Sequence, residues 1–128
     1  MNRYQLIDEQ YKLYESEDTI IRAFMRQGKL LLNGQDFGED VERLMGKDEY
    51  EYFCELDVRN TSSFITAIKR LHGDTSSLKE MLKKEYGYKD GSARFMKFCD
   101  DERIQYSFHA YWIKKGWLWW QKKLFWQK

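Results

Sequence analysis

Residues 33–58 read NGQDFGEDVERLMGKDEYEYFCELDV, and this stretch decides how the rest of the chain is organised. From Glu49 to Val58 the apolar and acidic side chains alternate, which is the period of a β-strand. One face of this strand is expected to join the core, and it carries Tyr50, Tyr52, Cys54 and Leu56. The other face is a row of carboxylates broken by one ring, and it carries Glu49, Glu51, Phe53, Glu55 and Asp57.

Acidic side chains are concentrated in the same stretch. From Asp36 to Asp57 there are nine acidic residues and only two basic ones, which gives a local charge of −7. A solvated face is the simpler explanation of such a cluster, but carboxylates beside aromatic rings also suit docking onto a basic protein surface. On the second interpretation, the partner-binding residues are Asp36, Glu39, Asp40, Glu42, Asp48, Glu49, Glu51, Glu55 and Asp57.

Length and composition predict a single domain over residues 1–128. The chain has nine Tyr, eight Phe and five Trp, enough apolar material for a core that needs no disulfide or metal. The absence of proline argues against Pro-rich linkers. The net charge of +1 predicts nothing about nucleic acid or membranes. The charge is unevenly distributed, however, because residues 58–128 carry fifteen basic and seven acidic side chains.

The two cysteines and the N-terminus indicate the compartment. Cys54 and Cys99 lack metal-ligand spacing, and the first residues lack the apolar stretch of a signal peptide. We therefore expect a cytoplasmic protein with two buried, free thiols. Charged residues interrupt every apolar run, so no membrane insertion is expected.

The N-terminal third predicts strands. Residues 3–14 alternate with a change of phase, which is typical of a bulged strand. Residues 19–27 also fit a helical stripe, but the apolar run that follows Gly28 favours a hairpin with a second strand at 29–34. Gly34 to Gly38 predicts a turn, and the spacing over 37–45 predicts a short helix.

The remainder predicts three helices, a strand and an extension. Asn60 or Thr61 is expected to cap the first helix, which closes at His72 and Gly73 and has the apolar stripe Phe64, Ile65, Ile68 and Leu71. A second helix opens at Asp74, Thr75 or Ser76 and ends at Gly87, and a third spans 92–101. Residues 103–113 alternate as a strand. The Lys/Trp-rich extension 114–128 favours an added strand, with an amphipathic helix as the competing interpretation.

These elements predict an α+β fold. It has an antiparallel sheet of about five to six strands with about three helices packed on one face. The helices are expected on one face because they come as a block in the sequence, which leaves the other face solvated or bound to a partner.

The sequence contains no signature of a catalytic, metal or nucleotide site. Ser107 and His109 share a strand face without an orienting acid, which argues against nucleophilic catalysis. His72 follows an apolar stripe at a helix end, where a structural role is the simpler account. Asp36, Glu39 and Asp40 lack the spacing of a calcium-binding loop. We therefore expect a protein that is not an enzyme and uses no cofactor or metal.

The order of these motifs resembles a known class of proteins. The resemblance covers roughly residues 18–112 and is carried by Gly34-Gln35-Asp36-Phe37-Gly38, Asp48-Glu49-Tyr50-Glu51-Tyr52-Phe53, Asp57 to Asn60-Thr61, Phe95-x-x-Phe98-Cys99 and Ile104-x-Tyr106-x-Phe108. It is similar to small bacterial immunity-type proteins of polymorphic toxin and contact-dependent growth inhibition systems. The extension 114–128 departs from that pattern.

The resemblance implies a non-catalytic toxin inhibitor that binds and neutralises a cognate toxin. Many such toxins are nucleases with basic substrate grooves, and the acidic residues between 36 and 57 are the complementary surface. The alternative class is a nucleic-acid-binding module that uses the basic, aromatic C-terminal third of the chain. Binding to nucleic acid without a protein partner, with affinity that falls steeply with salt, would identify that alternative.

Overall fold

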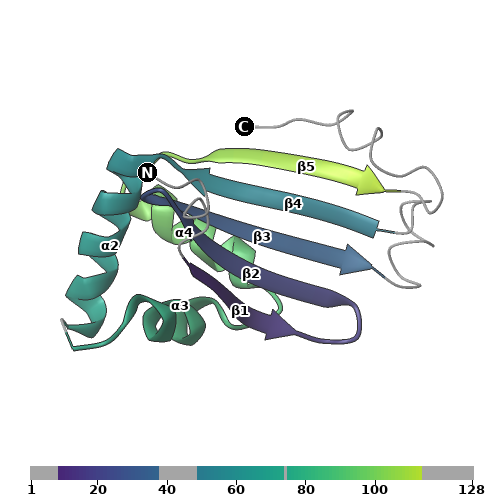
Figure 1. Ribbon diagram of the computed structural model, residues 1–128, viewed down its shortest axis with the longest axis horizontal. Coiled ribbons are helices and arrows are strands. Elements are labelled where there is room, and N and C mark those ends of the chain that lie inside the picture. Colours follow the sequence, from purple (N-terminus) through teal and green to yellow (C-terminus); the bar gives the residue numbers. More distant parts are fainter. Residues whose placement is uncertain (1–8, 38–48, 74, 114–128) are drawn as a thin grey trace.

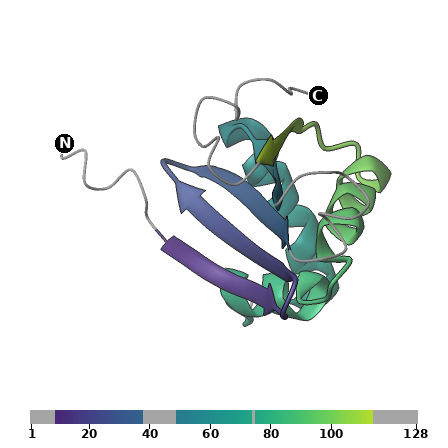
Figure 2. The ribbon, with the colours of Figure 1, turned by 90° about the vertical axis from the view of Figure 1, so that its right-hand side faces the viewer.

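An antiparallel sheet with helices on one side forms the described part of the chain, which comprises residues 9–37, 49–73 and 75–113 of a computed structural model. Figure 2 shows the two layers side by side, with the helices on one face of the sheet. The expected α+β fold is therefore confirmed. Within these ranges the strands are β1 (Glu9–Glu15), β2 (Thr19–Arg26), β3 (Lys29–Phe37), β4 (Glu49–Leu56) and β5 (Ser107–Ile113), and the helices are α2 (Val58–His72), α3 (Leu78–Tyr86) and α4 (Gly91–Asp101).

The strands follow one another across the sheet in chain order, and each is antiparallel to its neighbours. The block of three helices lies between β4 and β5 in sequence, yet β5 returns to pair with β4 (Figure 1). The register of β1 against β2 shifts between Lys12 and Tyr14, which confirms the expected bulge. Residues 3–8 of the predicted first strand lie outside the described residues.

The hairpin prediction for β2 and β3 is confirmed. Gln27 and Gly28 have φ values of 53° and 80°, as the two central residues of a type I′ turn require. The predicted turn from Gly34 to Gly38 is wrong for residues 34–37, because β3 continues through Phe37. Gly38 lies outside the described residues. The helix predicted over 37–45 also fails at Phe37, and its other residues lie outside the described ones.

Gly34 is needed for a reason other than a turn. It pairs with Tyr52 of β4, and a Cβ atom at Gly34 would lie 2.2 Å from the Tyr52 ring. The ring therefore lies directly across the glycine, a close approach that only a residue without a side chain permits. This arrangement lets a large side chain of β4 cross the middle of β3.

The first turn of α2 corrects the predicted cap. The carboxylate of Asp57 accepts a hydrogen bond from the backbone N–H of Asn60 at 2.7 Å, so Asp57 is the N-cap rather than Asn60 or Thr61. The predicted stripe is right for Phe64 and Ile68, which are buried. It is wrong for Leu71, which is 62% exposed, because a stripe does not reveal where the surface that covers it ends.

Thr61 fastens α2 to the sheet. Its buried hydroxyl accepts a hydrogen bond from the backbone N–H of Leu30 at 2.9 Å and donates one to the carbonyl of Leu56 at 3.2 Å. These two residues pair at the ends of β3 and β4. One side chain thus satisfies backbone groups of two strands and fixes where the helix begins.

An aromatic cluster fills the space between the helices and the sheet. The Phe64 ring lies 5.2 Å from the Phe95 ring and 5.5 Å from the Phe98 ring, and the Tyr86 ring lies 5.4 Å from that of Phe95. The sheet contributes the buried side chains of Ile21, Ala23, Leu30, Leu32, Cys54 and Leu56. Cys54 and Cys99 are buried and free, as predicted.

The last two helices and β5 follow the predictions closely. The N-cap of α3 is Ser77, one residue beyond the expected range, and it forms a reciprocal capping box with Glu80. α4 begins at Gly91, one residue before the predicted start. β5 begins at Ser107 rather than at residue 103. The extension 114–128 lies outside the described residues, and none of the described helices is long and apolar enough to cross a membrane.

Candidate functional site

The sheet face away from the helices, here called the open face, carries the predicted carboxylate row. Cys54 and Leu56 of β4 are buried. Because side chains alternate along a strand, the side chains between them point to the opposite face. The predicted division of β4 into a core-facing and an acidic side is therefore confirmed. The open-face side chains of β4 are Glu49, Glu51, Phe53 and Glu55.

Polar side chains of the neighbouring strand hold two of these carboxylates. The amide of Gln35 donates a hydrogen bond to Glu49 at 2.8 Å, and the amide of Asn33 donates one to Glu51 at 3.4 Å. The guanidinium of Arg22 in turn donates to the side-chain amide oxygen (Oε1) of Gln35 at 2.8 Å. These contacts restrict the carboxylates before any partner arrives, which lowers the entropy cost of using them in an interface.

Two aromatic rings lie among the carboxylates. Phe53 and Tyr111 of β5 meet edge to face with ring centroids 5.8 Å apart, and Tyr111 pairs in register with Glu51. Both rings are partly exposed. Partly exposed aromatic rings within a polar rim are typical of the centre of a protein–protein interface.

Basic side chains occupy the other half of the open face. By register, Arg22 and Arg26 of β2 and Lys29 of β3 point to the same side as the carboxylates, as does Lys12 of β1. Lys12 forms an ion pair with Glu15 at 2.6 Å. The open face therefore carries opposite charges on its two halves, and such an asymmetry can orient a charged molecule that approaches it.

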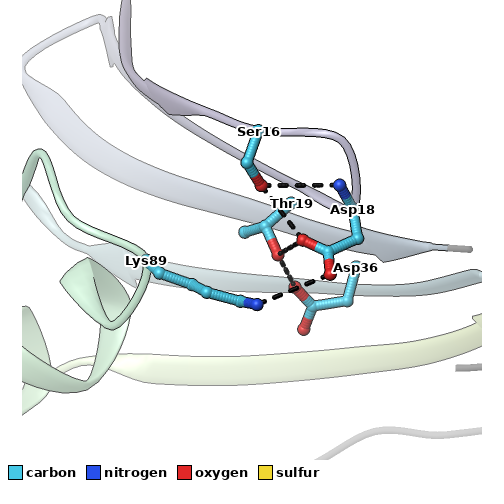
Figure 3. Close-up of polar contacts among 5 residues, drawn as sticks. All are labelled: Ser16, Asp18, Thr19, Asp36 and Lys89. Atoms are coloured by element: carbon cyan, nitrogen blue, oxygen red, sulfur yellow. Dashed lines mark hydrogen bonds and ion pairs between the residues drawn. The ribbon is translucent and has the colours of Figure 1, made fainter. Parts of the chain in front are cut away.

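Asp36 does not join the other carboxylates. It pairs in register with Tyr50, so it lies on the face that the helices cover. Figure 3 shows its carboxylate accepting a hydrogen bond from the Thr19 hydroxyl at 2.9 Å, beside Asp18 and Lys89. Burial raises the pKa of Asp36, and the Asp18 carboxylate adds to that effect. Asp36 is thus a half-buried residue of a local polar cluster.

Asp57 also has a local role, as the N-cap of α2. Its hydrogen bonds from Asn60 lower the pKa of Asp57 below the usual range. Glu39, Asp40, Glu42 and Asp48 lie outside the described residues. Three of the nine predicted residues therefore gather on the open face, namely Glu49, Glu51 and Glu55.

Tyr111 was missed as a candidate, although the alternation predicted over 103–113 puts it on the same strand face as Ser107 and His109. What brings it beside Phe53 is the register of β5 against β4. These strands are separated by three helices, so no local pattern predicts that register.

The two histidines have different positions. The imidazole of His72 lies 2.8 Å from a carboxylate oxygen of Glu85, which links the ends of α2 and α3. This confirms the structural role expected for His72. His109 pairs in register with Phe53 on the open face. Within the described ranges, no three His, Cys, Asp or Glu side chains form a group that could hold a metal ion.

Comparisons of the chain with protein families, with curated proteins and with solved structures find no match.

Proposed function

We propose that this protein is a non-catalytic inhibitor of the immunity type, which neutralises a cognate toxin by docking a basic surface of it onto the open face. The contact is centred on β4 and β5. Glu49, Glu51 and Glu55 supply the charge, and the Phe53–Tyr111 pair supplies the apolar centre.

One observation carries this proposal. Three carboxylates lie along one strand, around two partly exposed rings, on the sheet face that no described helix covers. If the carboxylates served only solubility, the rings between them would have no evident purpose, because large apolar side chains are costly to leave in water. Rings and charges together match an interface with a basic partner.

The charges and the rings contribute at different stages of binding. Carboxylates at the surface attract a basic protein from solution and speed association by about 10- to 1000-fold at low salt. The rings exclude water after docking and slow dissociation. A protein bound to the basic groove of a nuclease in this way keeps the nucleic-acid substrate out without any chemical step.

The experiment uses the toxin encoded beside the gene for this chain, with inhibition of the purified toxin as the readout. In the test variant, Glu49, Glu51 and Glu55 are all replaced by lysine. We expect it to stay folded and to inhibit the toxin at least ten-fold less well at low salt, chiefly through slower association. Raising the salt concentration should bring the inhibition by the variant and by the parent protein closer together, because salt screens the charges.

A matched control carries the same change of charge on the helical side. Asp100, Asp101 and Glu102 are exposed at the end of α4. Replacing all three by lysine suits the negative end of the helix dipole, so folding should be preserved. The proposal fails if the folded β4 variant inhibits as well as the control, or if the parent protein does not bind the toxin.

A further inference from the structure

Arginine and glutamate side chains occupy equivalent places on either side of the middle strand of the open face. Arg22 and Arg26 belong to β2, and Glu51 and Glu55 belong to β4. The strand β3 lies between these two. A second copy of the chain, turned by 180° about an axis that runs along β3 above the open face, would therefore place its β4 over β2 and its β2 over β4.

The two arginines form no ion pair among the described residues. The guanidinium of Arg22 donates to the neutral side-chain amide oxygen of Gln35 at 2.8 Å. The guanidinium of Arg26 lies over the Phe24 ring, 5.9 Å from its centroid. Neither contact cancels the charge of an arginine, so the positive charge of β2 is available to a carboxylate of another molecule.

The carboxylates of the open face differ in their partners. Glu15, on the edge strand β1, lies near Arg22 but is already paired with Lys12 at 2.6 Å. Glu55 is partly exposed and forms no ion pair within the described ranges. The arginines of its own copy lie two strands away, at a distance of about 10 Å across the sheet. Glu55 is therefore free to pair with an arginine of another molecule.

Partly exposed apolar side chains separate the charges on both strands. On the open face, Ile20 and Phe24 flank Arg22 along β2, and Phe53 lies next to Glu55 along β4. In the register of the sheet, Phe53 is level with Arg22, and Glu55 is level with Phe24. Charged and apolar side chains thus follow opposite orders on the two strands.

This opposite order suits the way in which two sheets pack face to face. Packed sheets are inclined by about 30°, which moves the rows of β2 and β4 past each other by about 2–3 Å, close to half the distance between rows. Phe53 of one copy would then lie between Arg22 of the other and one of the two apolar side chains beside it. Glu55 would lie between Phe24 and one of the two arginines. Each ring therefore meets an apolar side chain, and each such carboxylate meets a guanidinium.

The charges also select the orientation of the second copy. A half-turn about an axis that runs across the strands would place β4 of one copy over β4 of the other, and their carboxylates would repel one another. The half-turn about β3 avoids this repulsion. Its one unfavourable contact is between the two copies of Lys29, which is exposed at the end of β3, where water and salt screen the charges.

The open face is large enough for a specific dimer. Its five strands have between 7 and 9 residues each. Strands of this length make a sheet face with a flat area of about 600 Å². Side chains make the accessible area larger than the flat one, so the face approaches the 800 Å² or so that each partner buries in a standard interface. An interface of this size suits a dimer of modest affinity.

We propose that two copies of this chain pack open face to open face, with β4 of each over β2 of the other. The interface is isologous, so every contact between β2 and β4 occurs twice. The dimer covers the strand on which the proposed toxin contact is centred, so the second copy and the toxin compete for it. The dimer does not rest on the toxin proposal, because the chain forms it alone.

The test is sedimentation of the purified full chain at concentrations from about 1 μM to about 1 mM. We expect monomers at the low end of this range and dimers at the high end. One variant replaces Arg22 and Arg26 by glutamate, and a second replaces Glu51 and Glu55 by lysine. Each should raise the dissociation constant of the dimer at least ten-fold, because like charges then face each other in both halves of the interface.

An equimolar mixture of the two variants is the decisive sample. In a mixed dimer, the glutamates introduced on β2 of one chain face the lysines introduced on β4 of the other. In the other half of the interface, the unchanged arginines face the unchanged glutamates. We therefore expect the mixture to dimerise about as tightly as the parent, at a concentration at which either variant alone is a monomer.

A matched control makes the same change of charge on the helical layer. Arg59 and Lys79 are exposed in the first turns of α2 and α3, where the helix dipole favours acidic side chains. Replacing both by glutamate should preserve folding and leave the dissociation constant unchanged. Circular dichroism checks the folding of every variant. If the double arginine variant does not fold, Arg26→Glu alone takes its place, with a smaller loss of affinity expected.

Three results would overturn the inference. A chain that remains monomeric at the highest concentration does not pair through its open face. A dimer whose dissociation constant neither folded variant changes is held by another surface. Two folded variants that are monomeric alone and remain so when mixed show that β2 does not face β4. None of these measurements includes the toxin, so their outcome is separate from the test of toxin inhibition.

Discussion

Thr61→Val is the substitution that tests how the helical layer is attached to the sheet. Valine has the shape of threonine and the same branched Cβ, so packing and helix propensity change little. What disappears is the hydroxyl that accepts from the N–H of Leu30 at 2.9 Å and donates to the carbonyl of Leu56 at 3.2 Å. Both backbone groups then lose a partner in a buried place.

The expected cost follows from these two contacts. A buried donor left without an acceptor costs about 1–3 kcal/mol. The carbonyl of Leu56 loses less, because a carbonyl oxygen has a second lone pair and the bond it loses is the longer one. We therefore expect Thr61→Val to lower the free energy of unfolding by about 2–3 kcal/mol.

Urea denaturation measures this loss as a lower midpoint with an unchanged slope. Thr61→Ser keeps the hydroxyl and removes a buried methyl group, so it should cost only about 1 kcal/mol. Thr66→Val makes the same change at an exposed position of α2 and should stay within about 0.5 kcal/mol of the parent. If Thr61→Val is no less stable than Thr66→Val, the hydroxyl does not hold α2 to the sheet and the reasoning is refuted.

Three further predictions concern stability. Gly34→Ala should cost about 1–3 kcal/mol in the parent but clearly less in a Tyr52→Ala background, since the three atoms nearest to the new methyl group all belong to the Tyr52 side chain. Equal costs in the two urea titrations would contradict this. Asp57→Ala should destabilise the protein at pH 7. The difference in unfolding free energy between parent and variant should vanish as the pH falls through the lowered pKa of Asp57, because the parent then loses its charged cap. A difference that persists at pH 2 would argue against this prediction. Asp36→Asn should stabilise the protein at pH 7, because the raised pKa of Asp36 means that burial opposes its charged form. The gain in unfolding free energy should disappear below the ordinary aspartate pKa of about 3.9, where the carboxyl is protonated in both the folded and the unfolded chain. A loss of stability at pH 7 would show that the charge is needed.

Short-range patterns predicted β4 and the positions of α2, α3 and α4 correctly, for physical reasons that lie in the sequence itself. The alternation from Tyr50 to Leu56 reflects one face turned to the core and one turned to solvent. That successive side chains point to opposite faces follows from strand geometry alone. The hairpin at Gln27 and Gly28 follows from the φ values that its turn requires. Glycine is common just after the last turn of a helix, and this preference predicted the helix ends at Gly73 and Gly87.

The acidic cluster shows where local reasoning stops. Asp36 and Glu49 belong to one acidic stretch of sequence, yet β3 directs Asp36 to the helical side while β4 directs Glu49 to the open face. A residue that follows a strand in the sequence cannot be assigned to a face until the end of the strand is known. The expected turn at Gly34 hid the fact that β3 continues to Phe37.

The sequence by itself determined the fold class, the pairing of the hairpin, the burial of both thiols and the acidic side of β4. These depend on period, turn chemistry and hydrophobicity, which act over a few residues. The tertiary structure alone decided which rings meet across strands and which polar groups meet around α4. Tyr111 reaches Phe53, and Ser92 reaches Tyr52, only because three helices bring distant segments together. Contacts between segments so far apart in sequence depend on the packing of the whole domain rather than on any local pattern.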